Sequence, residues 1–175
     1  DVEFRAQKMA INLKNRIYYA DSLPIAMPNM GPEIFSAWCG CDYYFGASTT
    51  WSEPCIEDWE EDADEAVFDP EHPLFKKTVE FTEKLLELGQ GKFIVGLTDF
   101  HPGGDHLAAL RDPEVLAIDM IQNKEYVKEK LKSSYEEYFK AYEIFYEMLR
   151  EKEMPITSWT PLIHEGRYYI PSNDF

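Results

Sequence analysis

The apolar run at residues 92–98 (KFIVGLT) constrains the fold of this chain more than any other stretch. A short, nearly continuous run of this kind is typical of a strand that is buried on both faces of a parallel sheet. It follows an amphipathic stretch at residues 73–88, which predicts a helix that ends near Gly89. Turn-forming residues and further helical patterns come after it. A strand between helices indicates an α/β protein.

The rest of the chain alternates in the same way. Strand patterns occupy residues 23–30, 42–48, 154–159 and 167–171. Helical patterns occupy residues 4–19, 31–40, 107–111, 113–122 and 124–153. Such alternation predicts parallel strands joined by crossover helices. About four strands are too few to close an eight-stranded barrel, so the pattern allows either an open α/β sheet or a partial barrel.

Length and charge limit the classes of function. The 175 residues suit one domain spanning the whole chain, and the start at Asp1 suggests a piece of a longer protein. A net charge of −16 argues against a nucleic-acid partner and against anionic membrane surfaces. No apolar run approaches the roughly 20 residues of a membrane helix. The dense acids at residues 53–71 are interpreted as a solvated loop.

Three cysteines make a poor disulfide framework because their number is odd. Cys39 and Cys41 have one residue between them, which is not a C-x-x-C motif, and Cys55 stands apart. We interpret all three as reduced, mostly buried thiols, which predicts a cytoplasmic protein.

Polar residues concentrate after the 92–98 run, where the carboxyl end of a parallel strand would present them to a ligand. Asp99 and His101 are candidates for a general acid or base. Thr98, Gly103 and Gly104 are candidates for substrate contacts, since glycines let the backbone approach a ligand.

Three further side chains near other strand ends are candidates for substrate binding: Asn29, Trp51 and Trp159. Either tryptophan could wall a planar ligand or belong to the core. Asp105 is interpreted first as the N-cap of the helix that follows it. His101 and His106 could ligate a metal, but their spacing fits no zinc signature, so no metal ligand is assigned.

The residues that follow the buried run also carry a family resemblance. Residues 95–114 (VGLTDFHPGGDHLAALRDPE), together with 124–127 (KEYV), resemble the uroporphyrinogen decarboxylase superfamily. Residues 29–32 (NMGP), 157–161 (TSWTP) and 172–175 (SNDF) are similar to its bacterial, largely uncharacterised branch. The resemblance spans most of the chain and is most specific between Gly96 and Glu114.

This resemblance implies part of a TIM-type (β/α)8 barrel, of which the chain would supply about the first half. It implies an enzyme that is either decarboxylase-like or methyl-transferring, with a small-molecule, tetrapyrrole or corrinoid ligand. No cofactor is expected in this chain itself, whereas a complete protein could carry a corrinoid or zinc. Decarboxylation in the family uses an Asp at a strand end, and Asp99 is the nearest by position.

The chain departs from true uroporphyrinogen decarboxylases because it has no counterpart of their arginine-rich N-terminal segment. That departure favours methyltransferase-type chemistry, with tetrapyrrole decarboxylation as the alternative. A second alternative is a non-catalytic α/β domain that acts by binding or by pairing into a homodimer, since exposed strand edges are usually covered by a partner.

Overall fold

The computed structural model describes residues 1–160 and 162–174, and it is mixed α/β with mostly helical content. Pro161 and Phe175, which each end one of the sequence motifs, lie outside the described residues. The chain forms two compact units. Unit 1 comprises Asp1–Met30, Phe75–Asp99 and Glu143–Tyr168, and unit 2 comprises Gly31–Leu74, Phe100–Tyr142 and Tyr169–Phe175.

Unit 1 is built on a parallel strand pair, β1 (Ile25–Ala26) and β4 (Ile94–Val95), with Ile25 opposite Ile94. The chain at Thr157 lies beside the end of β4, because the Leu97 amide donates to the Thr157 carbonyl at 2.8 Å. The predicted parallel arrangement is therefore confirmed for these strands. Each is only two residues long, much shorter than the apolar runs that predicted them.

Gly96 explains how tightly these segments pack. A Cβ at this position would lie 3.0 Å from the Thr157 carbonyl oxygen and 3.2 Å from Met27 Cγ. The Gly96 amide meanwhile donates to the Ala26 carbonyl at 2.8 Å. Only glycine allows the three backbones to approach this closely.

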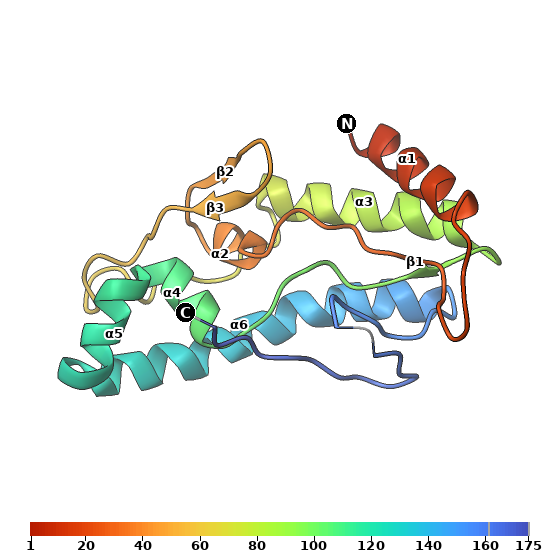
Figure 1. Ribbon diagram of the computed structural model, residues 1–175. Coiled ribbons are helices and arrows are strands. Elements are labelled where there is room, and N and C mark those ends of the chain that lie inside the picture. The colour runs from red at the N-terminus through yellow and green to blue at the C-terminus, as the bar shows by residue number, and fades with distance from the viewer. Residues whose placement is uncertain (161, 175) are drawn as a thin grey trace. The chain divides into compact units, whose positions relative to one another are not determined.

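Two helices of unit 1 lie side by side, α1 (Val2–Lys14) and α3 (Pro73–Gly89) (Figure 1). The Arg5 guanidinium lies 4.9 Å from the centre of the Phe81 ring, and Lys84 pairs with Glu3. Phe81 and Leu85 are fully buried, as the amphipathic pattern predicted. Helix α1 ends at Lys14 instead of Tyr19, and the apolar side chains that follow it, Ile17 and Tyr19, are exposed.

Unit 2 is mainly helical and carries an antiparallel hairpin of β2 (Tyr43–Phe45) and β3 (Thr50–Ser52). Its helices are α2 (Ile34–Trp38), α4 (Gly104–Arg111), α5 (Pro113–Gln122) and the first part of α6 (Lys124–Glu151). An aromatic cluster fills its interior, with ring centres 4.9 to 6.1 Å apart among Phe35, Trp38, Phe100 and Tyr138. Tyr138 and Tyr142 of α6 are buried and belong to this core.

The strands other than β1, β2 and β4 differ from the sequence predictions. Strand β3 was not predicted, because a strand of three residues is too short to show a clear alternating pattern. The expected strand at 167–171 is irregular, and the one at 154–159 is reduced to a single antiparallel bridge between Ile156 and His164. Both sheets have two strands, so the described residues form no closed barrel.

No helix within residues 1–160 and 162–174 is both long enough and apolar enough to cross a membrane.

Candidate functional site

The segment after β4 is held to the strand framework at its first residue. The Thr98 side chain is buried, and its Oγ1 donates to the Pro28 carbonyl at 2.9 Å. Thr98 therefore ties together the chain segments that follow β1 and β4. Asp99, the last residue of this part of unit 1, is half-buried, and its predicted catalytic role stays a prediction.

The two glycines that were predicted to face a substrate pack against the C-terminal segment of unit 2. Gly103 has a φ of 118°, and a Cβ there would lie 2.5 Å from the Ser172 carbonyl oxygen. The Gly104 amide donates to Asn173 Oδ1 at 2.7 Å. These contacts fix the start of α4 against residues 172–174.

Asp105 completes the same junction. The expected N-cap role is wrong, because α4 begins at Gly104 and Gly103 occupies the cap position. The Asp105 carboxylate instead accepts hydrogen bonds from the Ser172 hydroxyl and, at 2.5 Å, from the Asp174 amide. Its side chain therefore anchors the distant C-terminal segment, which the sequence pattern gave no means of placing.

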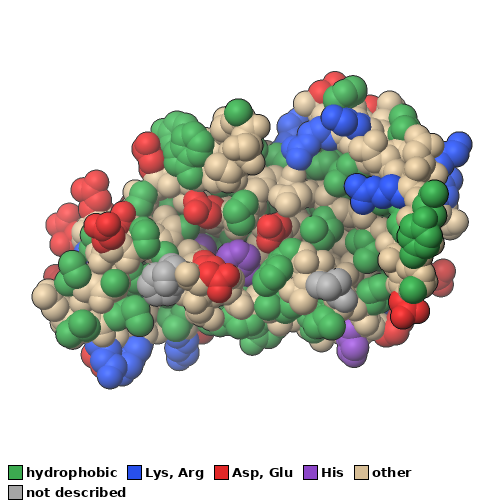
Figure 2. Space-filling model, viewed as in Figure 1, with side chains coloured by type: hydrophobic (Ala, Val, Ile, Leu, Met, Phe, Trp, Pro, Cys, Tyr) green, Lys and Arg blue, Asp and Glu red, His purple; other side chains and the backbone are tan. Residues whose placement is uncertain are grey.

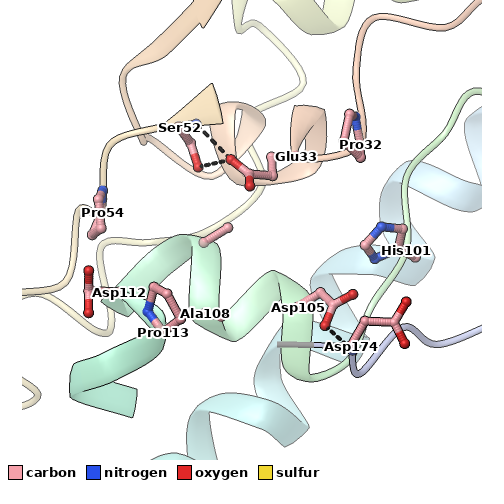
Figure 3. A pocket seen from close by; sticks show the side chains of 11 residues that line it. Pro32, Glu33, Ser52, Pro54, His101, Asp105, Ala108, Asp112, Pro113 and Asp174 are labelled. Carbon is pink, nitrogen blue, oxygen red and sulfur yellow. Dashed lines mark hydrogen bonds between the residues drawn. The ribbon is translucent and has the colours of Figure 1, made fainter. Parts of the chain in front are cut away.

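A pocket of about 480 Å³ opens in unit 2 between this junction and the β2–β3 hairpin. His101 lines it, together with side chains that come from four separate stretches of sequence (Figure 3). The other lining residues are Pro32, Glu33, Ser52, Pro54, Asp105, Ala108, Ala109, Asp112, Pro113 and Asp174. Figure 2 shows acidic side chains around a histidine near the middle of the viewed face.

His101 has a buried nitrogen, the Nδ1 atom, without a hydrogen-bond partner within the described residues. An unpaired buried nitrogen costs free energy, and native proteins rarely tolerate one without a reason. In a pocket wall, a ligand that supplies the missing partner is such a reason.

The charges of the pocket are of one sign among the described lining residues. Glu33, Asp105, Asp112 and Asp174 contribute carboxylates, and no Lys or Arg lines it. Glu33 accepts from the Ser52 amide at 2.7 Å and from the Ser52 hydroxyl at 2.9 Å. Such a field disfavours anions and suits a neutral or cationic ligand.

His106 does not share the pocket. It is buried, and the centres of its ring and the Phe35 ring lie 4.3 Å apart, with the ring planes tilted by 31°. Burial lowers its pKa to about 3, and the charges of Lys130 and His101 act in the same direction. His106 is therefore a neutral core residue. No three His, Cys, Asp or Glu side chains converge as metal ligands in the described part of the chain.

Two other predicted contact residues meet in unit 1. Asn29 and Trp159 both line a pocket of about 470 Å³, along with Ser158 and Arg16. The hydroxyl of Ser158, which lines this pocket, is buried without a hydrogen-bond partner in the described residues. These residues thus form a second candidate binding surface, which Arg16 makes basic.

Trp51 lies elsewhere. It sits on β3 in unit 2, is 46% exposed, and stacks on Tyr44 with ring centres 5.9 Å apart. The two residues face each other in the hairpin register. This contact stabilises the hairpin, and the predicted ligand stacking at Trp51 stays a prediction.

Sequence reasoning missed the carboxylates that come from distant segments. Glu33 precedes a short helix, and Asp174 follows an irregular stretch near the end of the chain. Neither lies next to the polar loop, so no spacing connects them. The one weak sequence signal for Asp174 was the polar run from Ser172 to Asp174 in which it lies.

Comparisons of the chain with protein-family models, with curated proteins and with solved structures found no match.

Proposed function

We propose that the chain belongs to a βα-barrel enzyme similar to the uroporphyrinogen decarboxylase superfamily and binds a small neutral or cationic substrate beside His101. The reaction we propose is methyl transfer. The observation that carries the proposal is the buried, unpaired Nδ1 of His101 in a pocket rimmed by carboxylates.

The strand arrangement of unit 1 supports the barrel part of the proposal. Two parallel strands, with a third segment hydrogen-bonded beside the end of β4, are a fragment of the pattern that a (β/α)8 barrel repeats. Polar groups follow all three segments, at Asn29, Thr98 and Ser158. Ligands in parallel α/β folds lie at this end of the strands.

The chemistry follows from the imidazole and its surroundings. A methyl acceptor such as a thiol, hydroxyl or amine loses a proton as it gains a methyl group. His101 is the group in the pocket that accepts this proton, and the carboxylates around it stabilise the imidazolium that forms. A corrinoid partner would supply the methyl group.

The same charges disfavour the alternative of tetrapyrrole decarboxylation. A substrate with several carboxylates would meet four carboxylate side chains in the pocket wall. The arginines of the chain do not offset this in unit 2, where Arg111 pairs with Asp119 at 2.7 Å.

The test is a titration of the purified chain with methylcobalamin and with a porphyrinogen analogue, followed by tryptophan fluorescence. Quenching by methylcobalamin that is lost in His101→Ala supports methyl transfer. Asp99→Ala tests the second predicted catalytic residue in the same assay. Binding of the porphyrinogen alone favours decarboxylation, and binding of neither, by a folded chain, overturns the enzymatic proposal.

Pairing with a second copy is the second candidate, and the exposed apolar side chains after α1 favour it. Ile17 and Tyr19 are 76% and 74% exposed, and Leu23 is 51% exposed. Light scattering with size-exclusion chromatography tests it, since a monomer at all concentrations would exclude pairing.

A further inference from the structure

Two of the three cysteines meet in unit 2. The Sγ atoms of Cys41 and Cys55 lie 2.7 Å apart, although 14 positions separate them in the chain. Both residues rest on the last turn of α4, where the Cys55 amide donates to the Leu110 carbonyl at 2.9 Å and the Cys41 thiol faces the Ala109 carbonyl. We propose that Cys41 and Cys55 are a peroxide-reactive dithiol pair, in which Cys55 is attacked first and Cys41 closes a disulfide.

The two thiols differ in access. Cys55 is partly exposed and lines a pocket of about 270 Å³, together with Cys39, Gly40, Asp62, Glu65 and Ala66. Cys41 is 3% exposed and Cys39 is 1% exposed. A small oxidant in the pocket therefore reaches Cys55 before Cys41.

The electrostatic surroundings agree with this order. The hydrogen bond with the Cys41 thiol lowers the pKa of Cys55, and the ammonium of Lys130 acts in the same direction against the opposing effect of burial. Burial raises the pKa of Cys39. Because the thiolate is the nucleophile, Cys55 is more reactive than Cys41.

Asp62 and Glu65 at the pocket indicate which oxidant fits. Two carboxylates disfavour an anionic disulfide such as oxidised glutathione, whereas hydrogen peroxide is small and uncharged. The Cys55 thiolate attacks one peroxide oxygen, the O–O bond breaks, and hydroxide leaves, which gives a sulfenic acid. The Cys41 sulfur then attacks the sulfenic sulfur, its proton leaves with the hydroxyl group as water, and the disulfide forms.

The disulfide would tie the base of the β2–β3 hairpin, since Cys41 precedes β2 and Cys55 follows β3. Ser52 at the end of this hairpin binds Glu33, and both line the His101 pocket. Oxidation would therefore fix one wall of that pocket. The proposal does not depend on what the pocket binds.

The test treats the reduced chain with stoichiometric hydrogen peroxide and measures intact mass, free thiols and the linked peptides. We expect a loss of about 2 Da, one Cys41–Cys55 linkage, and a melting temperature higher by roughly 5–10 °C for a closed loop of this size. The matched control Cys39→Ala should react in the same way. Cys41→Ala should stop at a sulfenic acid on Cys55, which dimedone traps.

Three results would overturn the proposal. They are thiols that stay reduced under peroxide, a linkage that involves Cys39, and over-oxidation of Cys55 in the unmodified chain without a disulfide. The peptide map of the unmodified chain decides the matter even where a variant fails to fold.

Discussion

Unit 2 contains two polar centres that differ in the hydrogen bonding of their buried groups. At Asp119, every carboxylate oxygen is paired: Oδ2 accepts from Arg111 Nε at 2.7 Å and from Trp59 Nε1 at 2.9 Å, and Oδ1 accepts from Asn123 at 2.5 Å. At His101, the buried Nδ1 has no partner in the part of the chain that is described. The Asp119 centre is thus complete within the chain, whereas the His101 pocket leaves a buried nitrogen available to a ligand.

The Asp119 centre also explains the acidic segment at residues 53–71. Arg111 donates to the Ile56 carbonyl at 3.0 Å and lies 5.1 Å from the centre of the Trp59 indole. Lys130 is buried and donates to the Ala63 and Ala66 carbonyls, the latter at 2.6 Å. The segment is irregular, as predicted, but its backbone is anchored by buried cations.

The largest effect is expected at the paired centre. Asp119→Ala leaves the Arg111 guanidinium buried without its carboxylate, which should lower the free energy of unfolding by about 3–5 kcal/mol. Asp112→Ala is the matched control, because Asp112 caps α5 through bonds to the Glu114 and Val115 amides. We expect about 1 kcal/mol for the control. Urea unfolding measures both, and equal losses would contradict the comparison.

The next effect depends on pH and on His106. Its pKa is about 3 in the fold and 6.5 in an unfolded chain, so below pH 6.5 only the unfolded state takes up the proton. Stability therefore falls as the pH decreases, by about 2 kcal/mol between pH 6.5 and roughly pH 4.5.

Urea unfolding at several pH values checks this, with His106→Leu as the comparison. That variant should flatten the dependence within the same interval, where Asp119 does not yet titrate because its pKa is lowered: burial opposes the shift, and hydrogen bonds from Arg111, Asn123 and Trp59 outweigh it. An unchanged slope would show that His106 is not the neutral core residue described.

A smaller effect is expected at the junction that borders the His101 pocket. Gly103→Ala combines an unfavourable φ with a contact to the Ser172 carbonyl, and should cost about 2–3 kcal/mol. Gly40→Ala shares the positive φ, 105°, but its Cβ would meet nothing within 4 Å. About 1 kcal/mol is expected there. The difference in melting temperature isolates the contact with Ser172, and no difference would mean that residues 172–174 do not pack on α4.

The smallest effect on stability is expected at His101 itself. Because its Nδ1 makes no hydrogen bond, His101→Leu removes no bond at that atom and should lower the free energy of unfolding by no more than about 0.5 kcal/mol. The same variant should abolish ligand binding. A loss above about 1.5 kcal/mol would place His101 with Asp119 among the structural groups.

How much of the fold and of the candidate site could be predicted depends on how far apart the interacting residues lie in the sequence. Helix α5 (Pro113–Gln122) was predicted at its actual bounds, because Asp112, Pro113 and the following apolar spacing are local signals. The Asp119 centre was not predicted, since Trp59 lies 60 positions away and its acidic neighbours suggested solvent. The loop that carries His101 was identified, but the four carboxylates around it were not assembled.

The sequence by itself determined the helices, the parallel pairing of the two apolar strands and the location of the polar loop after the second one. The helices and the loop depend on periodicity and capping within a few residues, which the linear order of side chains records directly. The parallel pairing followed from the alternation of strand and helix patterns along the chain. Only the tertiary structure decided which buried groups are paired. Hydrogen bonds such as Arg111–Asp119, Asp105–Ser172 and Cys41–Cys55 join atoms whose proximity is set by the packing of whole elements. That packing gives the Asp119 carboxylate its hydrogen-bond partners and leaves the Nδ1 atom of His101 without one in the described residues.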